Sequence, residues 1–406
     1  MILRMFSPPM ELHPVAKTYT KDGHRAISPE ATLKRVEPLL ATAGITRVAD
    51  ITDLDRIGIP VFSSIRPGAK EGAISIYNGK GASREQARVS AIMEAMERYS
   101  AEPKGEKVRR DLMENMLASE NAIDPRSLIL PQMINVHVNF HPIAWVKGYD
   151  LIEGEDIWVP AGAVYHPYES NKDLQLFRSN TNGLASGNNL EEAILHAMCE
   201  VVERDAWSIC EARRKPRGEI VVGDDCAVVS DLLQKFNKQG VEVHLKDLTS
   251  DVGIPTIAAA ADDVRMKDPA LLNLGVGTHL SPRVAAIRAL TEVAQSRCTQ
   301  IHGAREDTTK ADINRTLGYE RMKRMNSMYF SPSDGVSITD FSEFDTKDLL
   351  EDIEVVLDHL MDRGFEQVIV VELTRPELGV PVVRVIIPGM EIFAMDMDRM
   401  GPRLVA

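Results

Sequence analysis

Residues 189–204 form a predicted helix with two distinct faces. Its apolar residues recur with the i, i+3, i+4, i+7 spacing of a helix face turned toward a core. They are Leu190, Ala193, Ile194, Ala197, Met198 and Val201. At about 100° per residue, a second face, turned well away from the apolar one, carries four polar side chains. They are Glu192, His196, Glu200 and Glu203. Because neighbouring carboxylates repel one another, this face is expected either to be solvated or to bind a cation.

The same pattern occurs three times in the chain. With Ser83, Asn189 and Ser281 as helix N-caps, an alanine follows four and again eight residues later in each copy. The residues eleven positions after the caps are Glu94, Glu200 and Glu292, and those fourteen after are Glu97, Glu203 and Gln295. The residues seven after the caps, on the same face, are Ser90, His196 and Arg288. Close helix packing alone would explain the repeated alanines but not the repeated glutamates. The pattern therefore predicts three helices with matched polar faces.

A shorter repeat precedes three β-branched runs. Residues 57–61, 252–256 and 378–382 each contain Gly-x-Pro, which marks a turn into a strand. Because the two kinds of repeat extend over most of the chain, we expect residues 1–406 to form one interlocked domain. Within it, residues 216–275 alternate between strand and helix patterns and predict an αβ layer. Residues 307–335 are polar and lack a clear period, so they are predicted to be a mobile lid or partner loop.

Composition and charge exclude several classes of function. The chain has 47 Lys and Arg against 60 Asp and Glu, a net charge of −13, which argues against binding to nucleic acid. It also means that a bound polyphosphate would need a metal ion. The chain has no signal peptide and no apolar run long enough to cross a membrane, so we expect a soluble, cytoplasmic protein. The four cysteines form no Cys-x-x-Cys pair, which argues against disulfides and structural zinc.

Carboxylates that converge from three helices favour a site for Mg²⁺ and a nucleotide. Mg²⁺ prefers oxygen ligands and commonly bridges carboxylates and substrate phosphates. Arg288, Arg204 and Lys17 are available to neutralise a transferring phosphoryl group. A dinuclear iron site would need Glu-x-x-His pairs, and none occurs on these helices. In the loop before the central helix, Asn180 and Asn182 either satisfy the backbone of a turn or bind a ligand beside the acidic face.

Three motifs in this order resemble the YcaO family over nearly the whole chain. The first runs from Ser90 to Arg98, and the third is Arg288 with Glu292. Between them, the second consists of Asn182-Gly183, Glu192, Glu200, Glu203 and Arg204. The resemblance implies an α+β ATP-binding fold with strand–helix repeats, in which mixed or antiparallel sheets are flanked by helices.

The resemblance also implies roles for individual residues. The implied Mg²⁺ ligands are Glu94, Glu97, Glu192, Glu200, Glu203 and Glu292. The implied ATP-binding set comprises these six residues together with Lys17, Ser90, Asn182, His196, Arg204 and Arg288. The implied catalytic residues are Arg288, Glu203 and Glu97.

Members of this family activate a peptide-backbone amide by phosphorylating its oxygen, which turns that oxygen into a leaving group. In azoline-forming members the nucleophile is the Cys, Ser or Thr after the amide, and in thioamide-forming members it is external sulfide. Azoline-forming relatives typically carry a leader-binding module and a proline-rich C-terminus. Neither is expected here, because nothing precedes residue 1 and the tail, residues 400–406, has one proline.

The compact form is similar to archaeal members that work with a TfuA-like protein to install thioglycine in methyl-coenzyme M reductase. This resemblance implies a peptide or protein substrate, a TfuA-like partner, an external sulfide source and a homodimer. Two alternatives stay open: an azoline-forming cyclodehydratase, and an accessory protein that binds Mg-ATP without amide chemistry. Cys199, beside the acidic stripe, either carries a persulfide or is a small buried thiol.

Overall fold

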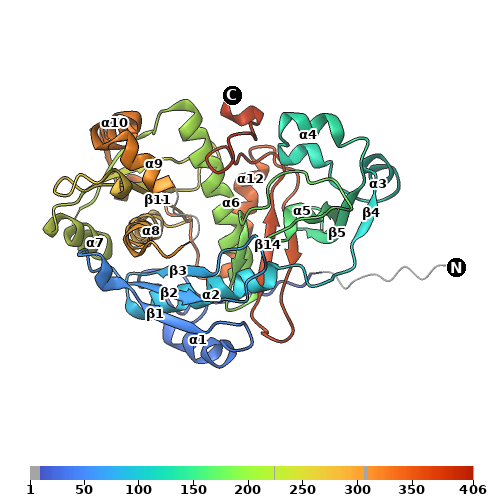
Figure 1. Ribbon diagram of the computed structural model, residues 1–406, viewed down its shortest axis with the longest axis horizontal. Helices are drawn as coiled ribbons and strands as arrows, with labels where there is room; N and C mark the ends of the chain where they lie inside the picture. Colours follow the sequence, from blue (N-terminus) through green and yellow to red (C-terminus); the bar gives the residue numbers. More distant parts are fainter. Residues whose placement is uncertain (1–9, 224, 306–309, 406) are drawn as a thin grey trace.

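The protein combines three sheets with helices that pack on their faces (Figure 1). The computed structural model describes residues 10–223, 225–305 and 310–405. The first sheet has the order β1-β2-β3, with β1 Arg47–Asp50, β2 Val61–Ile65 and β3 Ile76–Lys80. The second has the order β11-β10-β9-β8-β12, with β8 Gly218–Val221, β9 Glu242–Asp247, β10 Thr256–Asp262, β11 Asn273–Thr278 and β12 Gly335–Ser337.

The third sheet draws its strands from widely separated parts of the chain. Its order is β4-β5-β13-β14-β7, and β6 also pairs with β5. Its strands are β4 Arg109–Asp111, β5 Ile143–Asp150, β6 Glu155–Pro160, β7 Leu184–Ser186, β13 Ile369–Glu372 and β14 Val382–Ile386. Neighbouring strands in the three sheets are antiparallel except for the parallel pair β8 and β12. The predicted α+β fold with mixed or antiparallel sheets is confirmed.

Three long helices begin at the predicted caps. They are α2 Arg84–Ala101, α6 Leu190–Arg213 and α8 Pro282–His302. Ser83 accepts a hydrogen bond from the Gln86 amide at 3.2 Å, and Asn189 accepts one from the Glu192 amide at 2.8 Å. The other helices before α8 are α1 Pro29–Val36, α3 Met113–Ser119, α4 Gln132–His137, α5 Ala161–Val164 and α7 Ala227–Lys238. Those after it are α9 Lys310–Leu317, α10 Tyr319–Met325, α11 Ser327–Phe330 and α12 Leu349–Met361.

Each predicted Gly-x-Pro turn leads directly into a strand. The turns precede β2, β10 and β14, and their glycines, Gly58, Gly253 and Gly379, have φ of +72°, +83° and +58°. Each of these strands pairs antiparallel with the strand that enters a long helix: β2 with β3 before α2, β10 with β11 before α8, and β14 with β7 before α6. The third unit therefore joins residues near 185 to residues near 384, which interlocks the chain.

The small residues of the repeats let each helix lie directly on its own strand. A Cβ on Gly79 of β3 would overlap the backbone of Ala87 and Ala91 in α2. A Cβ on Gly277 of β11 would overlap the backbone of Ala285 in α8 in the same way. The glycines before the helices thus serve close packing of strand and helix, with alanine as the partner on the helix.

This contact predicts a stability cost for a single methyl group. Gly79→Ala should lower the free energy of unfolding by about 1–3 kcal/mol or more, because the strand and α2 must move apart. Gly68→Ala is the control, since a Cβ there meets no atom within 4 Å. Denaturant unfolding of the two variants and the parent measures the difference, and equal midpoints would contradict the close approach.

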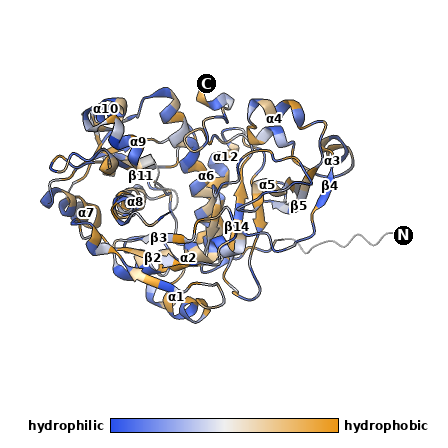
Figure 2. Cartoon of the chain, in the orientation of Figure 1, coloured by the Kyte–Doolittle hydropathy of each residue, from blue (hydrophilic) through white to orange (hydrophobic). Residues whose placement is uncertain are grey.

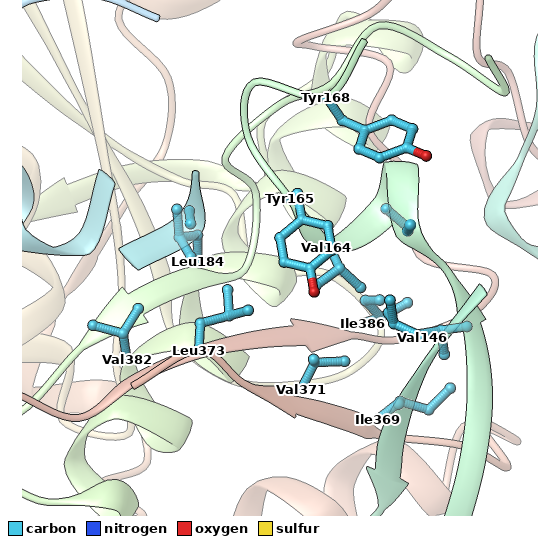
Figure 3. Close-up of a cluster of buried hydrophobic side chains, with 14 of the residues drawn as sticks. Val146, Val164, Tyr165, Tyr168, Leu184, Ile369, Val371, Leu373, Val382 and Ile386 are labelled. Atoms are coloured by element: carbon cyan, nitrogen blue, oxygen red, sulfur yellow. The ribbon is translucent and has the colours of Figure 1, made fainter. Parts of the chain in front are cut away.

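The third sheet separates two apolar cores. On one face, Val146, Leu184, Ile369, Val371, Val382 and Ile386 pack with Val164 and Tyr165 (Figure 3). On the other, Val370, Val383 and Val385 pack against α6 and α12. Figure 2 shows β14 as predominantly hydrophobic. The acidic helix α6 is thereby held against a rigid sheet at the centre of the molecule.

The segment at residues 307–335 differs from the expectation of an irregular loop. In the part of it that the structure describes, α9, α10 and α11 follow one another and lead to β12. These helices have eight residues or fewer, too short for a clear apolar period in the sequence. A role as a lid stays a prediction. Residues 216–275, predicted to be an αβ layer, contain β8, β9 and β10 of the second sheet, helix α7 and the first half of β11. In the described chain, every helix is too short or too polar to cross a membrane.

Candidate functional site

The polar faces of α2, α6 and α8 are joined by hydrogen bonds that link each strand–helix unit to the next, so that all three units are connected. Ser186, at the end of β7 before α6, donates its hydroxyl to Glu97 Oε2 of α2 at 3.4 Å. Thr278, at the end of β11 before α8, donates its amide N–H to Glu203 Oε2 of α6 at 3.0 Å. Gln295 of α8 donates its side-chain amide to a backbone carbonyl of β3, the strand before α2. Each strand thus contacts the residue fourteen positions after the N-cap of a neighbouring unit's helix, which fixes the three faces relative to one another.

Glu97 is a buried carboxylate among other carboxylates. Burial raises the pKa of Glu97 to about 8, Arg98 opposes this rise, and Glu200 and Glu94 add to it. Arg98 lies 3.4 Å from Glu97 and 3.5 Å from Glu94, each measured from a guanidinium nitrogen to a carboxylate oxygen. Without a further cation, Glu97 therefore carries a proton at neutral pH.

Glu203 occupies the equivalent position on α6 and has a similar environment. Burial raises the pKa of Glu203 to about 7, against the effect of Arg204, whose Nη1 lies 3.3 Å from Glu203 Oε1. Glu292 of α8 contributes to the rise. Arg288 approaches Glu203 only to 3.9 Å. A cation brought between these helices would favour the ionised form of both Glu97 and Glu203.

Glu292 of α8 has a different ionisation state because it has a direct partner. The ammonium group of Lys80, the last residue of β3, forms an ion pair with the Glu292 carboxylate. Burial opposes ionisation, but Lys80 and Arg204 hold the pKa of Glu292 below its ordinary value. Lys80 was not among the residues predicted from the sequence, although its place between two glycines just before a helix was a signal.

Arg288 and His196 form a pair at the centre of the site. Arg288 Nη1 lies 3.1 Å from His196 Nε2. Burial, and then the charge of Arg288, hold the pKa of His196 well below its usual range, so the imidazole is neutral and accepts a hydrogen bond from the arginine. Arg288 Nε is buried and has no partner among the described residues. The neutral His196 imidazole thus positions the Arg288 guanidinium without neutralising its charge, which can still bind an anion.

Two predicted residues, Lys17 and Glu192, already have partners in the protein. Lys17, with a side chain 1 % exposed, donates to the Thr346 carbonyl at 2.8 Å and pairs with Asp352. Glu192 accepts hydrogen bonds from the Ala26 amide at 2.9 Å and from the side chain of Asn188 at 3.0 Å. Glu192 therefore ties the N-terminal segment to α6, whereas Lys17 ties it to α12.

The remaining predicted residues lie on the same faces, except Asn182, which lies in the loop before β7. Ser90 of α2 and Glu200 of α6 are half-buried. Asn182 donates its backbone N–H to Asn180 Oδ1 at 3.1 Å, while its own Oδ1 is buried and has no partner in the described chain. Turn formation therefore accounts for Asn180, and the side chain of Asn182 is left for a ligand.

The arrangement fits a metal ion shared with a substrate better than a site built from protein ligands alone. Within the described ranges, no three His, Cys, Asp or Glu side chains converge closely enough to hold a metal ion. The six glutamates predicted as ligands are therefore spread over the three faces rather than gathered in one coordination sphere. Mg²⁺ is commonly held by one or two carboxylates together with substrate phosphates. Glu97 and Glu203, which a nearby cation would ionise, match the positive charge of such a complex, and Arg288, whose Nε has no partner in the described chain, matches its negative charge.

Comparison with known proteins identifies the family of this chain. A family described as YcaO cyclodehydratase, ATP- and Mg²⁺-binding, matches residues 78–391. The chain belongs to the YcaO family. It is 52% identical over 386 residues to a protein of Methanothermobacter thermautotrophicus, with 94% of this chain and 98% of that protein covered. It is 32% identical over 394 residues to a protein of Rhizobium leguminosarum bv. trifolii encoded in the tfuA 3′ region, with coverage of 91% and 89%.

Solved structures of the family share the fold. The YcaO protein from Methanopyrus kandleri, bound with AMPPCP and Mg²⁺, is 32% identical, with a TM-score of 0.80 and coverage of 95% of this chain and 98% of that chain. A heterocyclase in complex with substrate and cofactor is 24% identical, with a TM-score of 0.81, and this chain spans 55% of it. The family consists of ATP-dependent peptide-modifying enzymes, and ATP and Mg²⁺ are its cofactors, as the resemblance implied.

The raised pKa values predict that the nucleotide-free protein loses stability as the pH rises. Native Glu97 and Glu203 keep protons that unfolded glutamates release near their ordinary pKa. The stability from these protons is complete below that ordinary pKa and is lost as the pH passes about 7 for Glu203 and about 8 for Glu97. Unfolding free energies measured from about pH 5 to about pH 8 should therefore fall more steeply for the parent than for Glu97→Gln, because the native and unfolded states differ in bound protons over this range. Glu85→Gln, exposed on the same helix, should keep the parental slope, and equal slopes for all three proteins would refute the assignment.

Proposed function

We propose that this protein converts a peptide-backbone amide into a thioamide at the expense of ATP. The observation that carries the proposal is the meeting of three acidic helix faces around Arg288. The buried carboxyl groups there would be ionised by a bound cation, and the Arg288 guanidinium, paired with a neutral imidazole, can bind an anion. A Mg-nucleotide supplies both charges at once. ATP would serve to phosphorylate the amide oxygen, as in other enzymes of this family.

In the proposed site each predicted residue has a role. Glu94, Glu97, Glu192, Glu200, Glu203 and Glu292 would hold Mg²⁺ ions and, through them, the phosphates. Lys17, Ser90, Asn182, His196, Arg204 and Arg288 complete the nucleotide site. The metal ion, when bound, neutralises phosphate charge and so favours transfer. Arg288 and Arg204 balance the charge on the phosphoryl group, while Glu97 and Glu203 orient the complex.

The proposed reaction balances without an oxidant or a reductant. The amide oxygen attacks the γ-phosphorus, and ADP leaves. Hydrosulfide then adds to the amide carbon, the C–S bond forms, and the C–O bond breaks with release of inorganic phosphate. The former amide oxygen leaves in that phosphate, and the S–H proton ends on it, so that ATP and hydrosulfide give ADP, phosphate and a thioamide.

Two comparisons favour the thioamide branch. The proteins of Methanothermobacter and Methanopyrus match this chain over nearly their whole lengths, whereas this chain spans about half of the heterocyclase. A relative is encoded in a tfuA region, which supports a TfuA-like partner. We accordingly propose thioglycine formation in methyl-coenzyme M reductase, by a homodimer acting with a TfuA-like protein on externally supplied sulfide.

Product analysis tests the proposal. The purified chain is incubated with Mg-ATP, a TfuA-like protein, sulfide and a peptide from methyl-coenzyme M reductase. Phosphate release that needs both peptide and sulfide, with exchange of one oxygen for sulfur in the peptide mass, is the expected result. Loss of water from the peptide without a need for sulfide would instead identify an azoline-forming cyclodehydratase. Nucleotide binding without peptide-dependent phosphate release would identify an accessory protein.

Cys199 tests whether the sulfur comes from outside the chain. Burial raises the pKa of the Cys199 thiol to about 12, and the side chain is 2 % exposed, so it resembles a packing residue rather than a persulfide carrier. Cys199→Ala should therefore leave thioamide yield per unit of sulfide unchanged, as measured by mass spectrometry. A loss of yield in a variant that keeps Mg-ATP binding would point to the persulfide alternative.

A further inference from the structure

A buried arginine stands in the middle of an apolar strand. Arg384 belongs to β14, between Val382 and Ile386, which face the apolar core drawn in Figure 3. Its exposed fraction is 3 %. The pairing register places Ser63 of β2 and Ala258 of β10 at the equivalent positions of the other two units. The repeated architecture therefore does not require a charge at this position, and burying one costs several kcal/mol unless it is paired.

The Arg384 guanidinium is only partly satisfied. Its Nη2 donates to the backbone carbonyl of Asn180 at 3.0 Å and to the Asn180 side chain at 3.3 Å. Its Nε and Nη1 are buried and have no hydrogen-bond partner in the described chain, and no described carboxylate forms an ion pair with it. Burial lowers the pKa of Arg384 to about 10, so the group is still charged at neutral pH. A bound anion would therefore supply both the missing counter-charge and the missing hydrogen-bond acceptors.

A small cavity lies beside this guanidinium. Its volume is about 60 Å³, room for roughly two water molecules. A second buried arginine, Arg399, lines it, with two donors already bound to the carbonyls of Ile129 at 2.9 Å and Leu128 at 2.6 Å. The side chain of Asn182 also lines the cavity. Most of the remaining wall is apolar, formed by Phe177, Val201, Ile386, Ile387, Met390 and Ile392 among others.

The cavity adjoins the carboxylate site. Glu200 and Glu97 are the acidic groups whose charges favour the protonated form of Arg384. Under the proposed function both glutamates hold the metal ion, so their charge is already balanced when the nucleotide is bound. Arg384 and Arg399 then lack a counter-charge, which increases the need for an anion in the cavity.

We infer that the cavity formed by Arg384, Asn182 and Arg399 binds a small inorganic anion, and that this anion is the hydrosulfide consumed in the reaction. The inference rests on the proposed function for the identity of the ion. The apolar wall favours a singly charged, polarisable ion over phosphate, which is strongly hydrated and loses more on entering such a site. Binding there holds the nucleophile beside the acidic faces.

Titration of the full-length, nucleotide-free protein with sodium hydrosulfide tests the inference under anaerobic conditions. Thermal unfolding and calorimetry are recorded with hydrosulfide, chloride or inorganic phosphate at matched ionic strength. A saturable hydrosulfide effect that Arg384→Met loses and Arg384→Lys partly keeps is the expected result. Arg84→Met, which removes an exposed arginine paired with Asp50, is the charge-matched control and should behave as the parent.

Kinetics supply a second readout that a purely structural role would not give. Arg384→Lys should raise the hydrosulfide concentration for half-maximal thioamide formation by about tenfold, the effect of one weakened charge-assisted hydrogen bond, with the KM for ATP unchanged. Equal stabilisation by all three anions, preference for phosphate, or parental hydrosulfide binding in Arg384→Met would overturn the inference. Mg-ATP binding without hydrosulfide binding overturns it while leaving the proposed function standing. Hydrosulfide binding without thioamide formation supports the anion site and refutes the proposed reaction.

Discussion

Replacement of Glu203 by Gln should abolish the Mg²⁺-dependent stabilisation of this protein by ATP. At a nucleotide concentration of about a hundred times its Kd, the parent should gain about 2.7 kcal/mol in free energy of unfolding. Glu203 is 2 % exposed, lies between α6 and α8, and changes from protonated to ionised near pH 7. An amide at this position supplies no charge to a metal ion, so the variant should show almost none of the gain.

The substitution separates binding from folding. The Gln side chain can still accept the hydrogen bond that Thr278 donates at 3.0 Å, and it removes a carboxylate that is costly to bury. The nucleotide-free variant should thus unfold no earlier than the parent. Thermal titrations with ATP, with and without Mg²⁺, provide the measurement. Glu211→Gln, the same change two turns further along α6, is the control and should keep the parental response. A full Mg²⁺-dependent shift in Glu203→Gln would show that the Glu203 carboxylate does not take part in Mg-ATP binding.

The sequence was sufficient to predict the three helices and their faces, because each signal was local. Each of these signals involves residues that lie close together in the sequence: a helix cap, a regular apolar spacing, and a glutamate at a fixed number of residues from the cap. The caps Ser83, Asn189 and Ser281 precede helices as predicted, and the Gly-x-Pro turns precede strands. The α+β class and the family followed from these repeats and motifs.

Long-range pairing could not be predicted in the same way. Nothing local in β14 indicates that it pairs with β7, almost 200 residues earlier, and this pairing helps to place Arg384 near the carboxylates. Lys80 was missed for a related reason, since its partner Glu292 belongs to another unit. Lys17 shows the converse, because its charge is satisfied by Asp352, a residue from the other end of the chain. Its predicted contact with the nucleotide would require that ion pair to open or to be shared.

Arg288→Met should reduce peptide-dependent phosphate release by about a thousandfold while leaving Mg-ATP stabilisation largely in place. An arginine that balances charge on a transferring phosphoryl group acts mainly in the transition state, and its removal typically costs this much. The contacts of Arg288 suit such a role: a neutral imidazole at 3.1 Å and a carboxylate no nearer than 3.9 Å. By contrast Arg297, further along α8, is fixed by Asp55 at 2.7 Å and by Asp263 at 3.1 Å, as a structural ion pair requires.

Steady-state phosphate release, with ATP, peptide and sulfide varied in turn, measures the effect on kcat and KM separately. Arg283→Met is the matched control, because Arg283 lies on the same helix with its side chain 48 % exposed and pairs with Glu343 at 3.3 Å. Loss of kcat with a similar KM for ATP would establish Arg288 as a group that acts on the transferring phosphoryl. If the variant instead loses Mg-ATP stabilisation in proportion to activity, Arg288 binds ground-state nucleotide. Stabilisation of the transition state would then have to come from Arg204, which already contacts Glu203 at 3.3 Å.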